Sequence, residues 1–517
     1  MPAQADKRPP VATRTIGAIA ALSLALHAVV LAVTPFGIHR DEFLYFSMGN
    51  HLRLWHMDFP PAIAMLGAVS QFIFGHTVAA ARVFPAIEGT ILVVLAALFA
   101  RELGGRRFAQ GFAALCVLAS PLYLRSSTLF QPVVLDQICW TLALLAIARV
   151  ARAELESGDR RSAWLSFGVA IGLGLLCKFS ILFLCVSVLA AVLLTPMRRE
   201  LLTPWPWIAV LIMLIIGSPS VVGQITLDYP VVAQMRALNA GQLQHVTPAE
   251  YFSMQLMFLG PVGLLVAITG AVAMLVSDQL RRYAAVSLSC ILAFLLLLVL
   301  HGKPYYIGPI YPALLGAGAV VLGGMNSQRA RLVVPAVRWS AVALTIAFSL
   351  IALPMSLPIL SVTATARYAA RFAGGVALRT NHGTIDQLPQ DFADMLGWRD
   401  EASTLASVYR SLSPAEQRET VIVTGNYGQA GAAEFYASEF KLPPVVSTAG
   451  SFWFFGPGKL PGAVVISVGV DVRDLRKFWS SVAEVRRLER PWSVAEERDK
   501  PIFVSRGPRT SLQALWP

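Results

Sequence analysis

The chain has 517 residues, of which 56% are hydrophobic and only 14% are charged, and its mean hydropathy is +0.62. Soluble globular proteins carry about 25% charged residues, so this composition excludes an ordinary soluble protein and indicates an integral membrane protein. The formal net charge of +12 does not indicate nucleic acid as a partner, because Lys and Arg concentrate in short loops between apolar segments. The five cysteines lie in apolar segments, so we expect neither a disulfide framework nor a zinc site.

Residues 1–15 form a polar, basic tail, and an apolar segment runs from Ile16 to Phe36. This segment is longer than the core of a signal peptide and has no small-residue cleavage site after it, so we expect a retained first helix. A membrane-spanning helix needs about 20 apolar residues. Such segments predict about eleven transmembrane helices, at roughly 16–36, 77–100, 107–124, 131–150, 162–177, 179–195, 205–223, 255–276, 283–300, 304–323 and 337–355.

The basic loops between these segments include "RELGGRR" (101–107) and "RVARAELESGDRR" (149–161). The positive-inside rule places them in the cytoplasm together with the N-terminus. An odd number of crossings then puts the C-terminus of this multi-pass protein outside the cytoplasm. The same count requires that "DFPPAIAMLGAVSQFIFG" (58–75), although apolar, does not cross. We expect it to form helices at the outer surface or to dip back into the membrane.

Beyond about residue 356 the long apolar segments stop, and acids, arginines and prolines return. We therefore expect a transmembrane domain (16–355), with its first outer loop at 37–76, and an extracytoplasmic, periplasmic-type α/β domain (356–517). The glycines of "TGNYGQAGAAEFY" lack the G-x-G-x-x-G spacing of a dinucleotide loop, so a tight strand-to-helix turn is favoured. In this domain the pattern predicts strands at 420–425, 463–468 and 500–506, and helices at 429–440 and 472–485.

Several charged residues of the transmembrane half lie outside the basic cytoplasmic loops. In the predicted topology they gather on the outer side of the membrane. They are Asp41, Glu42 and Asp58 in the first outer loop, and Asp136, Lys178, His301 and Lys303 at outer helix ends or turns. An ionised side chain in an apolar segment costs about 2.5–3.5 kcal/mol, so such residues usually pair, line a polar cavity or serve function. Taken singly, Lys178 could reach the headgroups and Asp136 could cap its helix. Taken together, the lysines and carboxylates predict a polar cleft suited to a reaction on an anionic lipid headgroup.

Four stretches of the transmembrane half carry these charges. They are "HRDEFLYFSMGNHLRLWHMDFPPAIAML", "FQPVVLDQICWTLAL", "GLLCKFS" and "HGKPYYIGPIYPALL". Together they resemble the first outer loop, the second membrane-boundary Asp, the helix-turn Lys and the Lys-x-Tyr-Tyr-x-x-x-x-Tyr-Pro segment of the glycosyltransferase family 39 or PMT-2 proteins. This family belongs to the GT-C superfamily and includes protein O-mannosyltransferases and lipid A aminoarabinose transferases. The resemblance covers roughly residues 15–325 and implies a polytopic α-helical membrane protein of the GT-C type.

The resemblance also implies an inverting transferase, which moves a sugar from a polyprenyl-phosphate donor to a lipid, glycan or protein acceptor outside the cytoplasm. Asp41 matches the position of the proposed general base, and Asp136 would orient the acceptor or tune Asp41. Lys178 and Lys303 match the positions that stabilise the departing phosphate. The further candidates are Arg82 for the donor phosphate, Glu42, Asp58, Tyr305 and Tyr306 for the substrates, and Asp58 with His301 for a divalent metal ion, which stays open as a cofactor.

One departure from the family pattern is "MDFPP", because many relatives have a Lys where this chain has Phe59. Arg53, His56 or Arg82 could supply the missing charge. A flippase or transporter of lipid-linked sugars is the alternative function, since it would also place charges in an outward cavity. It predicts charges near the bilayer midplane and internal repeats, neither of which the sequence shows. A non-catalytic assembly protein predicts no clustering of acids with lysines.

Overall fold

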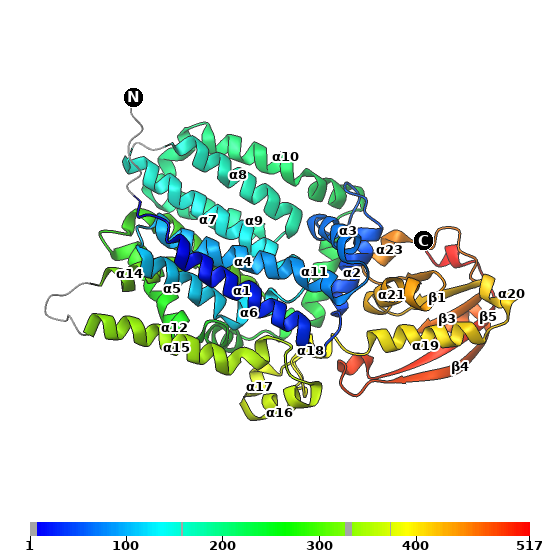
Figure 1. Ribbon diagram of the computed structural model, residues 1–517. Helices are drawn as coiled ribbons and strands as arrows, with labels where there is room; N and C mark the ends of the chain where they lie inside the picture. Colours follow the sequence, from blue (N-terminus) through cyan, green and yellow to red (C-terminus); the bar gives the residue numbers. More distant parts are fainter. Residues whose placement is uncertain (1–7, 157–158, 326–332, 373, 517) are drawn as a thin grey trace.

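The computed structural model describes residues 8–156, 159–325, 333–372 and 374–516. A bundle of long helices forms most of the molecule, and a smaller domain with a β-sheet lies at one end of it (Figure 1). The helices of the bundle are α1 (Thr13–Val33), α4 (Val78–Glu102), α5 (Arg107–Leu118), α6 (Pro121–Ser126), α7 (Pro132–Glu156), α8 (Arg160–Cys177), α9 (Ile181–Leu194), η1 (Pro196–Leu202), α10 (Trp205–Thr226), α12 (Pro248–Val276), η3 (Arg281–Tyr283), α13 (Ala284–Val299), η4 (Pro304–Ile310), α14 (Tyr311–Gly324) and α15 (Val333–Ser356).

Each of the eleven segments predicted to span the membrane contains helix. In the described part of the chain, eight helices are long and apolar enough to cross, and the bent pair of α9 and η1 would make a ninth, so the count of eleven stays a prediction. The segment predicted at 107–124 is divided into α5 and α6, because Pro121 lacks an N–H and starts a new helix. α12 is kinked at Gly260, where φ is 69° and a Cβ atom would lie 2.5 Å from the ring of Phe348.

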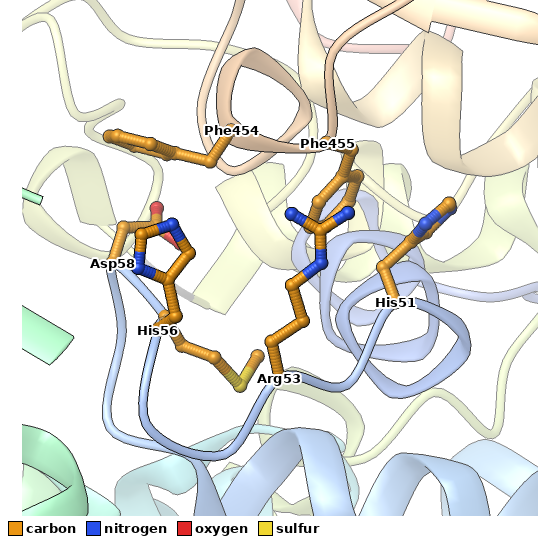
Figure 2. A pocket seen from close by; sticks show the side chains of 7 residues that line it. His51, Arg53, His56, Asp58, Phe454 and Phe455 are labelled. Atoms are coloured by element: carbon orange, nitrogen blue, oxygen red, sulfur yellow. The ribbon is translucent and has the colours of Figure 1, made fainter. Parts of the chain in front are cut away.

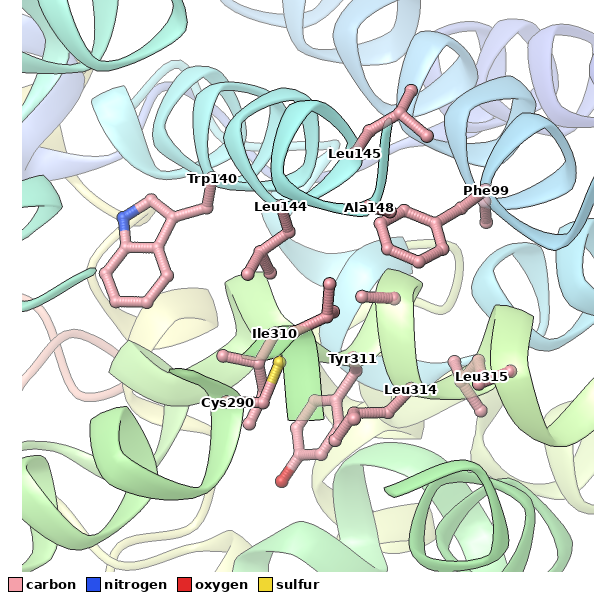
Figure 3. Close-up of a cluster of buried hydrophobic side chains, with 14 of the residues drawn as sticks. Phe99, Trp140, Leu144, Leu145, Ala148, Cys290, Ile310, Tyr311, Leu314 and Leu315 are labelled. Carbon is pink, nitrogen blue, oxygen red and sulfur yellow. The ribbon is translucent and has the colours of Figure 1, made fainter. Parts of the chain in front are cut away.

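The core of the bundle consists of apolar side chains from helices that lie far apart in the sequence. Figure 3 shows Trp140 and Leu144 of α7 on one side of this core and Ile310 and Tyr311, at the junction of η4 and α14, on the other. Trp140 is fully buried. Because this packing holds α7 in place, the acid one helical turn earlier, Asp136, also has a defined position.

α1 begins at the end of the bundle opposite the sheet domain (Figure 1). At the end of α4, the buried carboxylate of Glu102 forms ion pairs with Arg8, at 3.0 Å, and with Arg152 of α7, at 2.7 Å. These contacts join the tail, α4 and α7. The start of α1 and the sheet domain therefore lie at opposite ends of the bundle, which is the arrangement that an odd number of crossings requires.

Two short helices, α2 (Arg40–Asn50) and α3 (Ala62–Phe74), lie at the end of the bundle that faces the sheet domain (Figure 1). α3 has 13 residues, or about 20 Å, and is too short for a hydrocarbon core of about 30 Å. This length agrees with the expectation that the segment 58–75 does not cross. Further short elements follow α10: α11 (Pro230–Gly241) and η2 (Leu243–His245).

The sheet domain contains five strands in the order β2-β1-β3-β5-β4. β1 is parallel to β2 and β3, whereas β5 is antiparallel to β3 and β4. The strands are β1 (Thr420–Thr424), β2 (Val445–Ser447), β3 (Val464–Val468), β4 (Trp479–Glu489) and β5 (Asp499–Pro508). The helices after the bundle are α16 (Val362–Phe372), α17 (Gly374–Ala377), α18 (Gln390–Ala393), α19 (Trp398–Ser411), α20 (Pro414–Arg418), α21 (Tyr427–Phe435), α22 (Ala437–Phe440), α23 (Phe452–Phe455), α24 (Val472–Phe478), η6 (Ala495–Glu497) and η7 (Leu512–Leu515).

The predicted small α/β fold is confirmed, with one wrong element. The helix predicted at 472–485 ends at Phe478, and Trp479 begins β4, which pairs along its length with β5. Charged residues suited to a helix occupy the exposed face of this edge strand, so pairing with β5 outweighs local helix propensity. The strand β2 was not predicted, because its three residues are too few for a periodic signal.

Candidate functional site

The N-terminus of α2 positions the candidate base, Asp41, in its first turn. His39 is the N-cap: its Nδ1 accepts a hydrogen bond from the backbone N–H of Asp41 over 3.1 Å. In return the backbone N–H of His39 donates to the carboxylate of Glu42 over 2.6 Å, which completes a capping box. The two acids also interact favourably with the positive end of the helix dipole. Asp41 and Glu42 are neighbours in sequence, but these contacts already give them different roles.

Glu42 is fully buried and has all its partners inside the protein. Its Oε1 accepts from the backbone N–H of Phe130 over 2.7 Å and forms an ion pair with Arg82 of α4. Arg82 is also buried and donates to the backbone oxygen of Gly37 over 2.7 Å. This arrangement favours a structural role for Glu42 and Arg82 over the substrate-binding and phosphate-binding roles that the sequence suggested.

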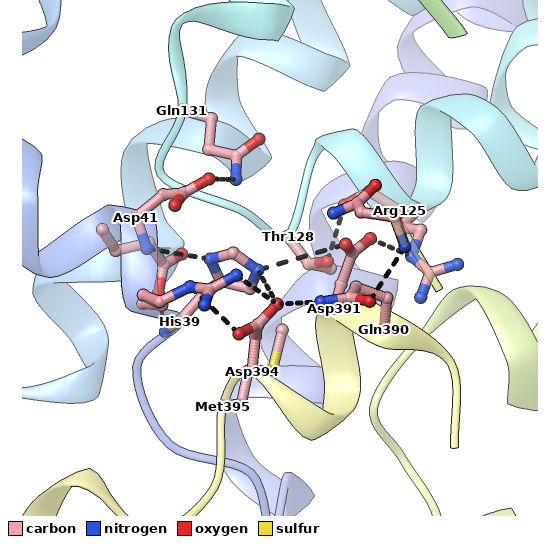
Figure 4. Close-up of polar contacts among 12 residues, drawn as sticks. His39, Asp41, Arg125, Thr128, Gln131, Gln390, Asp391, Asp394 and Met395 are labelled. Atoms are coloured by element: carbon pink, nitrogen blue, oxygen red, sulfur yellow. Dashed lines mark hydrogen bonds and ion pairs between the residues drawn. The ribbon is translucent and has the colours of Figure 1, made fainter. Parts of the chain in front are cut away.

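The carboxylate of Asp41 is half-buried, and its partners differ from those of Glu42. Its Oδ1 accepts a hydrogen bond from the hydroxyl of Tyr427, in the sheet domain, over 2.8 Å. Its Oδ2 accepts a longer contact, 3.4 Å, from the Nε2 of Gln131, which Figure 4 shows. Burial raises the pKa of Tyr427 well above its usual value, and the negative charge of Asp41 raises it further, so the phenol stays protonated and donates.

Lys178 and Lys303 reach the same region from two other parts of the chain. The ammonium of Lys178 lies 4.4 Å from the ring centroid of Tyr306 and 5.7 Å from that of Tyr305. Lys303 donates to the Oδ1 of Asn381 over 3.2 Å and interacts electrostatically with both Asp41 and Lys178. Burial lowers the pKa of Lys303 although Asp41 opposes this shift. The charged and phenolic groups that interact with Asp41 are Arg40, Lys303, Asp394, Tyr45, Tyr305, Tyr306 and Tyr427.

Asp136 lies beside Lys178. Its Oδ1 accepts from the indole N–H of Trp140 over 3.0 Å, and its Oδ2 accepts from the hydroxyl of Ser180 over 2.7 Å. Asp136 and Lys178 also interact electrostatically. These contacts hold the turn between α8 and α9, so Asp136 has the geometry of a residue that positions Lys178.

Asp58 lies in a different place, at the junction of the first outer loop and the sheet domain. Its Oδ2 accepts from the hydroxyl of Ser451 over 2.8 Å, and it lines a small pocket with His51, Arg53, His56, Met57, Phe454 and Phe455. Figure 2 shows Arg53 and His56 extending from the loop toward the side where Phe454 and Phe455 lie. Burial raises the pKa of Asp58 to about 6, and the hydrogen bond from Ser451 offsets only part of this shift.

The residues present do not fit the metal site that the sequence left open. Asp58 is buried against Ser451, whereas His301 is exposed in the turn after α13, where its φ is 53°. In the described ranges, no three His, Cys, Asp or Glu side chains are grouped so that they could hold a metal ion.

A network of polar contacts holds the N-terminus of α2 (Figure 4). The sequence did not predict this network. The Nε of Arg40 lies 3.2 Å from Asp394, and the Nε2 of His39 lies 4.0 Å from Asp391 and 3.9 Å from Asp394. Arg125 forms an ion pair with Asp391 at 2.6 Å. Burial alone would raise the pKa of Asp391, but Arg125, His39 and Lys303 outweigh it and the pKa is lowered. No local signal in "LPQDFADMLGW" indicates this contact, because its partners His39, Arg40 and Arg125 lie more than 250 residues earlier.

Residues 58–222 match the model of the dolichyl-phosphate-mannose-protein mannosyltransferase family, PMT_2. No curated protein sequence matches the chain.

Solved structures that share the fold include the following three. ArnT from Cupriavidus metallidurans bound to undecaprenyl phosphate superposes with a TM-score of 0.61 and 16% sequence identity, over 95% of this chain and 98% of that one. The apo form of the same protein superposes with a TM-score of 0.60 and 16% sequence identity, over 96% of this chain and 98% of that one. The apo oligosaccharyltransferase of Archaeoglobus fulgidus superposes with a TM-score of 0.50 and 14% sequence identity, over 88% of this chain and 69% of that one. The resemblance to the PMT-2 family is thus confirmed over residues 58–222, and the chain has the multi-pass helical membrane fold of these solved structures.

Proposed function

We propose that this protein is an inverting glycosyltransferase that moves a sugar from a polyprenyl-phosphate donor to a lipid, glycan or protein acceptor. The observation that carries the proposal is the convergence of Asp41, Lys178 and Lys303 on one cluster, although they come from α2, the α8–α9 turn and the segment before η4. A carboxylate and two ammonium groups are the groups that such a reaction needs.

In the proposed reaction, the acceptor hydroxyl or phosphate oxygen attacks the anomeric carbon of the sugar. Where the acceptor is a hydroxyl, Asp41 removes its proton as the new C–O bond forms. The bond between the anomeric carbon and the phosphate oxygen breaks, and the polyprenyl phosphate leaves with the electron pair. Attack from the face opposite the leaving group inverts the configuration of that carbon.

Lys178 and Lys303 would stabilise the negative charge that develops on the departing phosphate. Lys303 is half-buried and its pKa is lowered, so a bound phosphate would favour its charged form. The aromatic rings of Tyr305 and Tyr306 restrict where the ammonium of Lys178 can lie. Asp136 would act on the same step by holding Lys178.

The donor class and the side of the membrane are part of the proposal. The ArnT structure that shares this fold binds undecaprenyl phosphate, which supports a lipid carrier of that kind. The predicted basic loops support a cytoplasmic N-terminus, and the sheet domain would then be periplasmic or otherwise extracytoplasmic in a bacterial inner membrane.

The test is sugar transfer by the purified full-length protein in lipid nanodiscs. The probes are radiolabelled undecaprenyl-phosphate pentoses and hexoses, incubated with extracted cell-envelope lipids, glycans and proteins. We expect one donor to be consumed and its label to appear in an acceptor, with Asp41→Asn reducing turnover at least a hundredfold. The matched control is Asp400→Asn, an exposed acid on α19. If Asp41→Asn transfers sugar as fast as the parent protein, Asp41 is not the base; if no donor is consumed, the proposed reaction is wrong.

A further inference from the structure

The hydroxyl of Tyr427 contacts the candidate base from a position 386 residues later in the chain. Tyr427 is the first residue of α21, and this helix lies directly against α2. A Cβ atom at Gly431 would lie 2.7 Å from the Cβ of Phe43, and one at Gly428 would lie 2.5 Å from the Cγ of Arg40. The glycines noted in the sequence therefore allow a close approach between the two helices, which brings Tyr427 to Asp41.

The turn that carries Tyr427 is itself fixed from within the sheet domain. Asn426 caps α21 by accepting from the backbone N–H of Gln429 over 3.0 Å. The buried carboxylate of Glu497 accepts from the side chains of both residues, over 2.7 Å from Asn426 and 3.0 Å from Gln429. Arg490 forms an ion pair with the same carboxylate at 3.1 Å. Tyr427 thus belongs to a rigid part of the domain, as a residue that orients another side chain must.

The two oxygens of Asp41 are not equally engaged. Oδ1 has a hydrogen bond of normal length from Tyr427, whereas among the described residues Oδ2 has only the 3.4 Å contact from Gln131. A carboxylate oxygen can accept more than one hydrogen bond, so Oδ2 can still accept the proton of the hydroxyl group that receives the sugar.

We propose that Tyr427 is a positioning residue for Asp41: its hydroxyl holds Oδ1 and turns Oδ2 toward the acceptor, so the sheet domain completes the transferase site. This inference rests on the proposed function, in which Asp41 is the base. It gives the sheet domain a direct part in the reaction. The opposite possibility is that the Tyr427 hydroxyl stands where the acceptor hydroxyl must bind, in which case its removal would raise turnover.

The test compares Tyr427→Phe with Tyr436→Phe in the full-length protein. Tyr427→Phe removes only the hydroxyl, and the ring keeps its place beside Gly450. Tyr436→Phe removes a hydroxyl from the end of the same helix, where the ring packs against Phe43 at 5.9 Å between centroids. Turnover is measured with the donor and acceptor found by the screen above, and binding is measured with undecaprenyl phosphate as the probe.

We expect Tyr427→Phe to lower kcat about tenfold to a hundredfold, because a hydrogen bond to an ionised group is lost. The KM for the donor and the affinity for undecaprenyl phosphate should change less than about twofold, since the phosphate contacts remain. The acidic limb of the pH–rate profile should move to higher pH, because the carboxylate loses a hydrogen-bond donor. Tyr436→Phe should match the parent protein in all three measurements.

Two results would overturn the inference. The first is an unchanged or raised kcat in Tyr427→Phe, and the second is a lower kcat with an unmoved pH profile, which would indicate a merely structural effect. Both presuppose that the parent protein turns over and that Asp41→Asn does not. If the parent protein transfers no sugar from any donor, the proposed function fails instead, and the two failures are therefore distinguishable.

Discussion

Asp58 of the first outer loop accepts a hydrogen bond from Ser451 of the sheet domain over 2.8 Å, and this contact joins two parts of the chain that are 393 residues apart. Asp58 is buried, and burial raises its pKa from an ordinary value of 3.8 to about 6. A buried acid with a raised pKa stabilises the folded state when protonated. Its favourable contribution is complete below about pH 4 and is lost as the pH rises through about 6.

The first prediction concerns the pH dependence of stability that Asp58 causes. Asp58→Asn keeps an oxygen that can accept from Ser451 but carries no charge at any pH. At pH 7.5 we expect the variant to unfold at a higher temperature than the parent protein. Its free energy of unfolding should be greater by an amount on the order of 2 kcal/mol. At pH 4 the two proteins should unfold at the same temperature. Thermal unfolding in detergent, followed by intrinsic fluorescence, checks this, with Asp400→Asn as control. A lower unfolding temperature for Asp58→Asn at both pH values would contradict the assignment.

The second prediction concerns the buried pair of Glu42 and Arg82. Removing one partner leaves the other charge buried and unpaired, which costs about 3–5 kcal/mol. We expect Glu42→Gln and Arg82→Met each to lower the unfolding temperature strongly. The double variant should lose much less than the sum of the two single losses, because neither charge remains. Arg82→Met with normal stability and weaker binding of undecaprenyl phosphate would instead support the phosphate-binding role.

The helical architecture could be predicted from the sequence because its causes are local. Apolar runs of about 20 residues mark the spanning helices, and each of the eleven predicted segments contains helix. β1, β3 and β5 were also recognisable, since buried strands carry continuous β-forming residues. The short strand β2 and the strand β4 were not, because pairing with distant neighbours decides them.

The candidate site could be predicted only in part. The side of the membrane and the family motifs pointed to Asp41, Lys178 and Lys303, which the structure brings into one cluster. Only the family resemblance favoured Asp41 over Glu42 as the base, and only the packed structure shows that Glu42 is enclosed by Arg82 and Phe130. Contacts made by Tyr427 and Asp394 depend on the docking of the sheet domain onto α2, which leaves no local pattern.

The third prediction concerns the proposed phosphate-binding role of Lys178 and Lys303. Lys303→Gln and Lys178→Gln should each weaken the binding of undecaprenyl phosphate about tenfold or more, because each removes a half-buried cation from the place proposed for the phosphate. Binding is measured in nanodiscs with a fluorescent analogue of the lipid. The control is Lys459→Gln, an exposed lysine of the sheet domain. Unchanged affinity in Lys303→Gln would remove its phosphate role.

The fourth prediction tests whether docking of the sheet domain onto α2 is needed for turnover. Gly431→Val would place side-chain atoms within 3 Å of Phe43, including its backbone, so α21 must move away from α2. We expect the hydrogen bond between Tyr427 and Asp41 to be lost, transfer to fall at least tenfold, and limited proteolysis to cleave between the bundle and the sheet domain more rapidly. The control is Gly241→Ala, where an added Cβ atom meets nothing within 4 Å. Because Tyr427→Phe keeps the two helices together, it should lower transfer without increasing proteolysis. Full activity in a Gly431→Val protein whose sheet domain is readily cleaved would show that the domain does not contribute to the site.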